Sequence, residues 1–362
     1  MAIFSENILA NSTIPDRDVI RISQIERGSL GIAGVGIAGI GYYLPERILT
    51  NAMLSDKVDI VDDWIQTRTG IRERHIVADE QATSDLGAAA GGKAMQNAGV
   101  TADEIDLVIV ATGTADMQFP STACIIQELL QLNNAAAFDV TAGCTGFIYA
   151  LAVGSQFVAS GFYQTVLVIG AEVISRIVDW EDPETCILFG DGAGAVVLQP
   201  SPPGYGLLSA KLGANGAGGR HLLMPAGGTR LPNTPQTLAE KQNKLKMNGQ
   251  EVFRFAVKTL PKVTLQALEA ARLSIEDVSL IIPHQANQHI IEAAARRLDL
   301  PLEKFMLNID RYGNMSAASV PVALCEAVEA GRIKHNDVVV MTAFGAGLTW
   351  GSVVLRWKDP TR

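Results

Sequence analysis

The stretch that decides the fold is AFDVTAGCTGFIYALAVGSQFVASGFYQTVLVIGAE, at residues 137–172, because the chain carries a faint second copy of it. The second copy is LNIDRYGNMSAASVPVALCEAVEAGRIKHNDVVVMTAFG, at 307–345. Each copy predicts a strand, a tight glycine turn, a helix, a glycine that stops the helix, and a buried strand. An offset of 170 residues aligns Gly143 with Gly313 and Gly161 with Gly331. The pattern therefore predicts two related α/β units.

A second pair of similar segments lies upstream of the first pair. AMQNAGVTADEIDLVIVATG at 94–113 and ALEAARLSIEDVSLIIPHQA at 267–286 both contain an alanine-rich helix, an acidic loop and an aliphatic run. The β-branched runs at 166–169 and 338–340 are typical of central strands that are covered on both faces. We therefore predict an α/β protein built from two packed halves.

Length and composition agree with this organisation. The chain has 362 residues, of which 48% are apolar and 19% charged, a composition that excludes an intrinsically disordered protein. We place the N-terminal half at 31–205 and the C-terminal half at 206–362, after a polar N-terminal extension at 1–30.

Charge and cysteine usage narrow the functional class. The net charge of −9 excludes broad nucleic-acid binding, because no excess of Lys and Arg is present to neutralise phosphates. The first 30 residues lack the pattern of a signal peptide, and no apolar stretch is long enough to span a membrane. The four cysteines form no CxxC pair and have no zinc-like spacing to a histidine. We therefore expect a cytoplasmic enzyme with free thiols, no metal and no membrane partner.

One cysteine has the surroundings of a nucleophile. Cys144 lies in TAGCTGF, whose small residues let the backbone turn sharply and leave the sulfur approachable. The repeat places Cys144 and Asn314 at equivalent points, each just after a strand and at the start of a helix. A helix N-terminus lowers a thiol pKa, so we expect a thiolate-rich Cys144 near neutral pH. A free cysteine is more often structural, and we assign that role to Cys124, Cys186 and Cys325.

Two polar residues of the second half complete a candidate site. His284, in LIIPHQAN, is expected at the end of a buried strand, where it can donate a hydrogen bond to a substrate oxygen. Asn314 is expected in the tight turn of DRYGNMSAAS. Taken singly, each is more often structural, as a satisfied histidine or an ordinary turn asparagine.

Together, DVTAGCTGF, LIIPHQAN and DRYGNMSAAS closely resemble the β-ketoacyl-acyl-carrier-protein synthase III family of the thiolase superfamily. The resemblance runs from about Gly36 to the C-terminus and includes CILFGDGAGAVVL at 186–198 and AFGAGLTWGS at 343–352. It implies a thiolase-like, five-layered αβαβα fold made of two duplicated halves, in a homodimer. It also implies an acyltransferase that initiates fatty acid synthesis. The reaction would be decarboxylative Claisen condensation of an acyl-CoA primer with malonyl-acyl carrier protein, giving a 3-oxoacyl-acyl carrier protein.

The resemblance assigns chemical roles to the candidate residues. Cys144 would attack the acyl-CoA and hold the acyl group as a thioester. His284 and Asn314 would hydrogen-bond the malonyl thioester carbonyl and stabilise the enolate that remains after loss of CO2. The backbone N–H groups of Cys144 and Ala346 would form the oxyanion hole. The coenzyme A thioester is then a substrate, and no cofactor is implied.

The resemblance also implies six substrate-binding residues: Trp64, Arg68, Phe119, Gly249, Phe253 and Asn287. Trp64 and Arg68 match positions that contact the CoA nucleotide. Phe119 matches one that reaches into the acyl pocket of the partner subunit, although an ordinary core phenylalanine is the alternative. Acyl carrier proteins are acidic, so we expect docking on a basic patch. The candidates are Arg254 and Lys258 on one helix, with Arg296 and Arg297 on the helix after His284.

Three departures from the family pattern leave the acyl donor open. Pro183, in DWEDPET, stands where the family commonly has an arginine that closes over the adenine. Ile60 replaces a small polar residue, and His289 stands where an arginine for carrier docking is common. An alternative is therefore a condensing enzyme or acyltransferase of a specialised polyketide or secondary-metabolite pathway with a different acyl donor.

A remote alternative is a nucleotide-binding dehydrogenase, because GVGIAG at 34–39 fits the GxGxxG fingerprint. Such a site requires a helix directly after the fingerprint. GYYLP follows instead, which predicts the end of a strand and a turn.

Overall fold

The computed structural model describes residues 19–20, 34–55, 58 and 62–359. Two five-stranded sheets form its frame. The first sheet has, in spatial order, β2 (Gly34–Tyr43), β8 (Asp191–Ser201), β7 (Val166–Val173), β5 (Leu107–Ala111) and β6 (Ala136–Val140). The second has β1 (Val19–Ile20), β9 (Gly206–Ala214), β14 (Thr349–Arg356), β13 (Val338–Gly345) and β12 (Val278–Pro283). The runs at 166–169 and 338–340 lie in fully buried central strands, as predicted.

The two sheets share one topology. In the first, the spatial order takes the first, fifth, fourth, second and third strands of the chain. In the second, β9, β14, β13 and β12 repeat this order, and Phe305 makes a parallel bridge to Ile281 at the place that β6 occupies in the first sheet. The aligned glycines all have left-handed φ angles: 55° at Gly143 and 63° at Gly313, 73° at Gly161 and 66° at Gly331. The predicted duplication is therefore confirmed.

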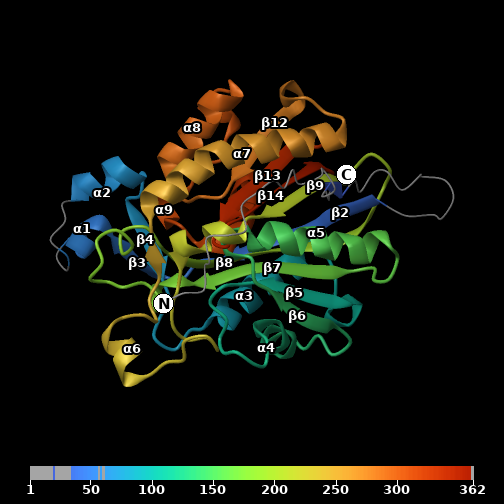
Figure 1. The fold of residues 1–362 in the computed structure, drawn as a ribbon. Coiled ribbons are helices and arrows are strands. Elements are labelled where there is room, and N and C mark those ends of the chain that lie inside the picture. Colours follow the sequence, from blue (N-terminus) through green and yellow to red (C-terminus); the bar gives the residue numbers. More distant parts are fainter. Residues whose placement is uncertain (1–18, 21–33, 56–57, 59–61, 360–362) are drawn as a thin grey trace.

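Helices lie between the sheets and cover both outer faces (Figure 1). The second sheet is covered by α7 (Gly249–Ala271) and α8 (Gln288–Leu298), and the first by α3 (Thr83–Ala98) and α4 (Thr122–Leu129). Between the sheets, α5 (Gly146–Ala159) and α10 (Ser319–Glu329) contact strands of both. This arrangement is the predicted five-layered αβαβα fold.

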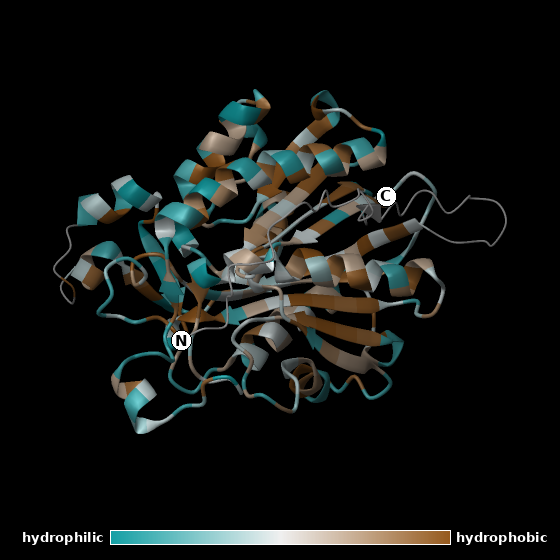
Figure 2. Ribbon diagram, in the orientation of Figure 1, coloured by the Kyte–Doolittle hydropathy of each residue, from teal (hydrophilic) through white to brown (hydrophobic). Residues whose placement is uncertain are grey.

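The middle layer is apolar because a helix between two sheets has no solvent-facing side. Phe147, Ile148 and Leu151 of α5 are fully buried, in a core cluster that also includes residues of β7 and β13. Figure 2 shows the strands of both sheets as mostly brown, whereas α7 and α8 alternate between teal and brown. The largest core therefore joins the two halves along the middle layer.

Shorter elements complete the described part of the chain. They are the helices α1 (Asn51–Ser55), α2 (Asp62–Thr69), α6 (Pro235–Ala239) and α9 (Ile309–Tyr312), the paired strands β3 (Arg47–Thr50) and β4 (Glu73–Ile76), and the paired strands β10 (Leu222–Leu223) and β11 (Lys246–Met247). Across the described ranges, no helix is both long enough and apolar enough to cross a membrane. Apart from Val19 and Ile20, the predicted extension at 1–30 lies outside the described residues, as does Ile60.

Two outcomes concern features away from the site. The GxGxxG stretch at 34–39 lies wholly within β2, which continues to Tyr43, so the dehydrogenase alternative fails. Cys186 and Cys325 are buried, as predicted, but Cys124 is exposed, which corrects the prediction. The aliphatic neighbours of Cys124 suggested burial, yet in α4 it is Ala123 and Ile126 that face the core.

Candidate active site

The candidate nucleophile lies in a turn that packs against the second half. Cys144 belongs to a 3-10 turn, Gly143–Thr145, between β6 and α5. A Cβ on Gly143 would lie 2.8 Å from the Ala346 nitrogen, and one on Gly345 would lie 2.6 Å from the Cys144 nitrogen. Both distances are shorter than real Cβ atoms reach, so glycine is what allows these two backbone segments to meet.

This contact brings the two predicted oxyanion donors together. The backbone N–H groups of Cys144 and Ala346 both act on the Cys144 thiol, where they oppose the rise in its pKa. The Thr349 hydroxyl lies 2.9 Å from the Ala142 carbonyl oxygen, 3.0 Å from that of Ala346 and 3.0 Å from the Thr145 hydroxyl. Two N–H groups that converge at a thiol can bind the negative oxygen of a tetrahedral carbon attached to that sulfur.

The expected thiolate is not favoured. Cys144 has only 9% of its surface exposed. Burial raises the pKa of its thiol to about 11; the Ser316 hydroxyl opposes this rise and the Glu172 charge adds to it. The prediction from the helix N-terminus is therefore wrong in direction, because lost hydration of the charged sulfur outweighs the helix dipole. The thiol must lose its proton during the attack rather than before it.

His284 follows β12, as predicted, and its side chain is almost completely buried, with 1% exposed. Its Nδ1 lies 2.6 Å from the Ser319 Oγ, and its ring meets Phe344 edge-on with the centroids 5.5 Å apart. Burial lowers the pKa of His284 to about 3, so the imidazole is neutral at physiological pH. The contact with Ser319 occupies Nδ1 and leaves Nε2 for a substrate.

Asn314 lies shortly before α10, but it follows α9 and Gly313 rather than a strand, which corrects the prediction. In the second half the strand equivalent to β6 is reduced to the bridge at Phe305, and the chain forms α9 before the turn. The Asn314 Oδ1 accepts the Ser316 N–H at 2.8 Å. Because Oδ1 is engaged, the Nδ2 amino group is the part left to donate to a substrate oxygen.

One short segment links the three catalytic candidates. Ser316 holds Asn314 through its N–H, and the Ser316 side chain is also one of the groups that act on the pKa of the Cys144 thiol. The Ser319 hydroxyl contacts His284 and lies 2.8 Å from the Ser316 carbonyl oxygen. Sequence reasoning missed both serines. The available signal was SAAS at 316–319, two residues after Asn314, since residues three apart can share one helix face.

The residues predicted to bind CoA gather around a cavity of about 1400 Å³. Its walls include five of the six predicted substrate-binding residues: Trp64, Arg68, Gly249, Phe253 and Asn287. The Arg68 guanidinium lies over the Trp64 ring, 4.9 Å from the centroid. An aromatic ring beside a guanidinium suits a planar, negatively charged nucleotide.

None of the three catalytic candidates lines this cavity, but Asn314 lies behind its wall. Leu188, in the wall, accepts the Asn314 N–H through its carbonyl at 2.8 Å.

Asn287 donates from Nδ2 to the Arg68 carbonyl oxygen at 2.9 Å. His289 Nε2 lies 2.8 Å from the Thr67 carbonyl oxygen, a contact that contributes most to raising the pKa of His289. The start of α8 is therefore tied to the end of α2 beside the cavity.

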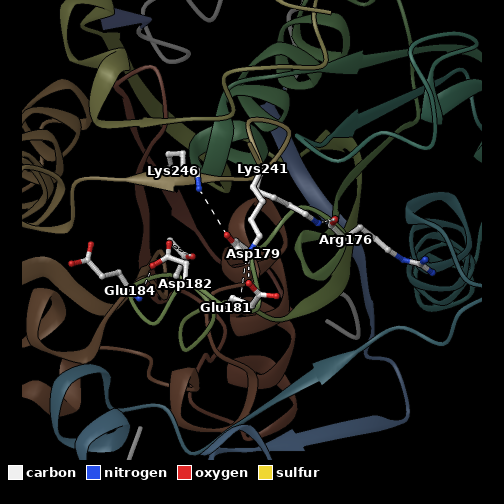
Figure 3. A network of polar contacts seen from close by, with 9 residues as sticks. Arg176, Asp179, Glu181, Asp182, Glu184, Lys241 and Lys246 are labelled. Carbon is white, nitrogen blue, oxygen red and sulfur yellow. Dashed lines mark hydrogen bonds and ion pairs between the residues drawn. The ribbon is translucent and has the colours of Figure 1, made fainter. Parts of the chain in front are cut away.

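An ion-pair network anchors the loop that carries Pro183, another wall residue. Lys241 Nζ lies 2.9 Å from Asp179 and 2.6 Å from Glu181, and Lys246 Nζ lies 3.9 Å from Asp179 (Figure 3). Exposed ion pairs stabilise little, but Asp179 is buried and shared by two lysines. The network therefore fixes a proline at the wall position where the resembled family commonly has an arginine.

The four predicted docking residues are all exposed and lie on two adjacent helices. Arg254 lines the cavity and pairs with Glu251 at 2.5 Å, and Lys258 lies one turn further along α7. Arg296 and Arg297 lie in the last turn of α8, about 12 Å along the helix from its start, at 1.5 Å per residue. Of these four, Arg254 is the residue that reaches both the surface and the cavity.

Phe119 lies away from the cavity and is 81% exposed, so the alternative of a core phenylalanine is wrong. Met117 beside it is also exposed.

Comparison with known proteins gives consistent relatives. Residues 138–216 match the family described as 3-oxoacyl-[acyl-carrier-protein] synthase III, and residues 268–357 match its C-terminal region. The chain is 53% identical over 323 residues to a β-ketoacyl-[acyl-carrier-protein] synthase III of Caldanaerobacter subterraneus, covering 89% of this chain and 98% of that protein.

Solved structures agree. A β-ketoacyl-[acyl carrier protein] synthase III from Thermus thermophilus is 46% identical with a TM-score of 0.83, covering 89% of this chain and 99% of the other. The priming β-ketosynthase of the R1128 polyketide pathway is 34% identical with a TM-score of 0.84, covering 91% and 97%.

Proposed function

This chain belongs to the 3-oxoacyl-[acyl-carrier-protein] synthase III family of condensing acyltransferases, and from that premise we propose its reaction in detail. An acyl-CoA primer condenses with malonyl-acyl carrier protein to give a 3-oxoacyl-acyl carrier protein, which initiates fatty acid synthesis. The observation that carries the proposal is the 316–319 turn, whose hydrogen bonds hold His284 and Asn314 and whose Ser316 side chain also acts on the Cys144 thiol.

Acylation comes first in this proposal. The Cys144 sulfur attacks the acyl carbonyl carbon, and its proton passes to the departing coenzyme A sulfur. The N–H groups of Cys144 and Ala346 bind the oxyanion of the tetrahedral intermediate. Their positions are fixed by the close contacts at Gly143 and Gly345, so the donors need no rearrangement when charge develops.

Decarboxylation and condensation follow. His284 Nε2–H and Asn314 Nδ2–H donate to the malonyl thioester carbonyl, and loss of CO2 leaves an enolate. The enolate carbon attacks the acyl carbonyl carbon, the bond from that carbon to the Cys144 sulfur breaks, and the released thiolate takes a proton from water. For Nε2 to carry the imidazole proton, the Ser319 hydroxyl must turn its proton to Nδ1 and release the Ser316 carbonyl oxygen, to which it donates at 2.8 Å. A histidine with a pKa of about 3 stays neutral, so it stabilises the enolate without protonating the carbanion.

Partners and assembly are also part of the proposal. The acyl-CoA nucleotide binds in the cavity beside Trp64 and Arg68, and no separate cofactor takes part. Acidic carrier protein docks on Arg254 and Lys258, with Arg296 and Arg297 extending the basic surface. Phe119 contacts the partner subunit of a cytoplasmic homodimer, because contact with a partner would remove its exposed apolar ring from water.

A second candidate has a specific observation in its favour. Pro183 in the cavity wall offers no cation to stack on an adenine, and the chain is also similar to a priming β-ketosynthase of a polyketide pathway. The alternative is a condensing enzyme of a specialised pathway whose acyl donor is carrier-bound or bulkier.

Intact-mass spectrometry after exposure to a panel of acyl-CoAs and acyl carrier proteins tests both candidates. We expect one acyl mass on the peptide that contains Cys144, and none in Cys144→Ala. Acylation by short acyl-CoAs supports the fatty acid starter, whereas acylation only by acyl carrier protein supports the alternative. A mass that maps to Cys124, Cys186 or Cys325 contradicts the proposed nucleophile.

A further inference from the structure

Glu172 is a buried carboxylate that the mechanism above does not use. It lies in β7 with none of its surface exposed. Its Oε2 accepts from the Thr114 hydroxyl at 2.6 Å, the Gly113 N–H at 3.1 Å and the Thr112 hydroxyl at 3.3 Å. Its Oε1 accepts from the Ser316 hydroxyl at 2.8 Å. The carboxylate therefore joins the first half to the turn that carries Asn314.

The charge of Glu172 works against the proposed nucleophile. A negative group near a thiol disfavours the thiolate, and Glu172 contributes to the raised pKa of Cys144. Burial also raises the pKa of Glu172 itself, which shows that holding this charge is costly. Hydrogen bonds from Thr114, Ser316 and Gly113 oppose that rise, and a site with so many donors is built for an anion. The Glu172 charge disfavours deprotonation of Cys144 in the acylation step, so the role of this carboxylate lies in another step of the reaction.

Glu172 acts on the active site through Ser316. Its φ angle is +47°, a left-handed conformation that residues other than glycine rarely adopt. In this conformation its N–H donates to the Asn314 Oδ1 at 2.8 Å. The hydroxyl of the same residue is held by Glu172, and the Ala317 N–H lies 3.5 Å from the same carboxylate oxygen. Glu172 thus stabilises the backbone conformation that aims the Asn314 carboxamide.

We propose that Glu172 is a positioning residue for Asn314, acting through Ser316 to keep the Nδ2 amino group turned toward the enolate oxygen. The inference rests on the proposed role of Asn314 in the condensation. If Ser316 relaxed, the carboxamide would be free to rotate and present Oδ1, an acceptor, to a negatively charged oxygen. A donor contributes to a transition state only when it is oriented beforehand.

Glu172→Gln is the decisive variant, because it keeps the shape and removes the charge. Decarboxylation of malonyl-acyl carrier protein should fall by about 10²-fold in kcat, approaching the effect of losing a transition-state donor outright, with KM near wild type. Acylation of Cys144 should be retained. The pH profile of Cys144 alkylation by iodoacetamide should move down by about one unit, since a neighbouring like charge has gone.

Asp191→Asn is the matched control. Asp191 is a buried carboxylate of the neighbouring strand β8, and it accepts from the Ser175 N–H, the Ser175 hydroxyl and the Val77 N–H. Its replacement should lower thermal stability without moving the alkylation profile. A Glu172→Gln protein that behaves in the same way, or that loses acylation and decarboxylation in equal proportion, overturns the inference.

Ser316→Ala provides a second, independent test if Glu172→Gln does not fold. It removes the hydroxyl that Glu172 holds, so decarboxylation should again fall. Acylation of Cys144 should be retained, as in Glu172→Gln. A folded Ser316→Ala protein with wild-type decarboxylation overturns the inference. Failure of the wild-type protein to acquire an acyl group at Cys144 would contradict the proposed function rather than the role of Glu172.

Discussion

Gly345→Ala should damage the oxyanion hole without touching any catalytic side chain. The added Cβ would lie 2.6 Å from the Cys144 nitrogen and 3.1 Å from both its Cα and its Cβ. The nitrogen and Cα belong to the backbone, so the clash cannot be relieved by moving a flexible side-chain end. The two N–H donors must then move apart. Loss of one such donor costs about 10²–10³ in rate, and the overpacking costs about 1–3 kcal/mol of stability.

The assay is the rate at which the protein gains an acyl mass, with a thermal melt measured in parallel. Gly228→Ala is the control, because a Cβ there meets nothing within 4 Å. We expect Gly345→Ala to fold with reduced stability and to acylate at least 10²-fold more slowly, and Gly228→Ala to match wild type. Wild-type acylation by a folded Gly345→Ala protein would refute the proposed oxyanion hole.

The other predictions address the second half-reaction, stability, docking and assembly. His284→Ala and Asn314→Ala should each lose about 10²–10³ in malonyl decarboxylation while still forming acyl-enzyme; near-normal condensation in both would exclude the mechanism. Because the pKa of His284 falls from 6.5 to about 3 on folding, its contribution to stability is complete above pH 6.5. Between pH 6.5 and about 3, the contribution of His284 to the free energy of unfolding decreases by about 1.4 kcal/mol per pH unit. His284→Gln should abolish this pH dependence in acid-unfolding measurements. Reversing Arg254 and Arg296 to Glu should raise the KM for malonyl-acyl carrier protein, most clearly at low salt, while acylation by a small CoA donor is unchanged; equal loss in both would contradict docking. Phe119→Ala should alter acyl-chain preference in turnover assays, and a fully active monomer by sedimentation would rule out the cross-subunit role.

The repeat made the architecture predictable. Paired glycines and paired strand–helix–strand patterns recur at a fixed offset, and the two sheets follow that recurrence strand by strand. The central strands were readable because a strand covered on both faces is apolar on both faces. The five-layered arrangement, with helices between the sheets, was implied by the family resemblance. Placement of the six substrate-binding residues depended on the family resemblance rather than on the pattern. The structure then brought five of them around one cavity.

Predictions from the local sequence failed where residues distant in the chain determine the environment of a side chain. The helix N-terminus indicated a low pKa for Cys144, but burial and Glu172, 28 positions away in the chain, raise it. Ser319 does not stand out in the sequence, since a serine among alanines is common. A glutamate in an aliphatic strand is unusual, but the sequence around Glu172 does not indicate its partners. Their roles follow from contacts between the halves: Glu172 with Ser316, and Ser316 with both Cys144 and Asn314.

The sequence by itself determined the two related α/β halves, the buried central strands and the turns that carry Cys144 and Asn314, because periodicity and glycine positions are local properties of the chain. Only the tertiary structure decided the protonation of Cys144 and His284, the orientation of the Asn314 carboxamide, and the meeting of Cys144 with Ala346. The physical reason is that desolvation, electrostatic interaction and hydrogen-bond direction depend on distances between atoms. Those distances are set when the two halves pack together.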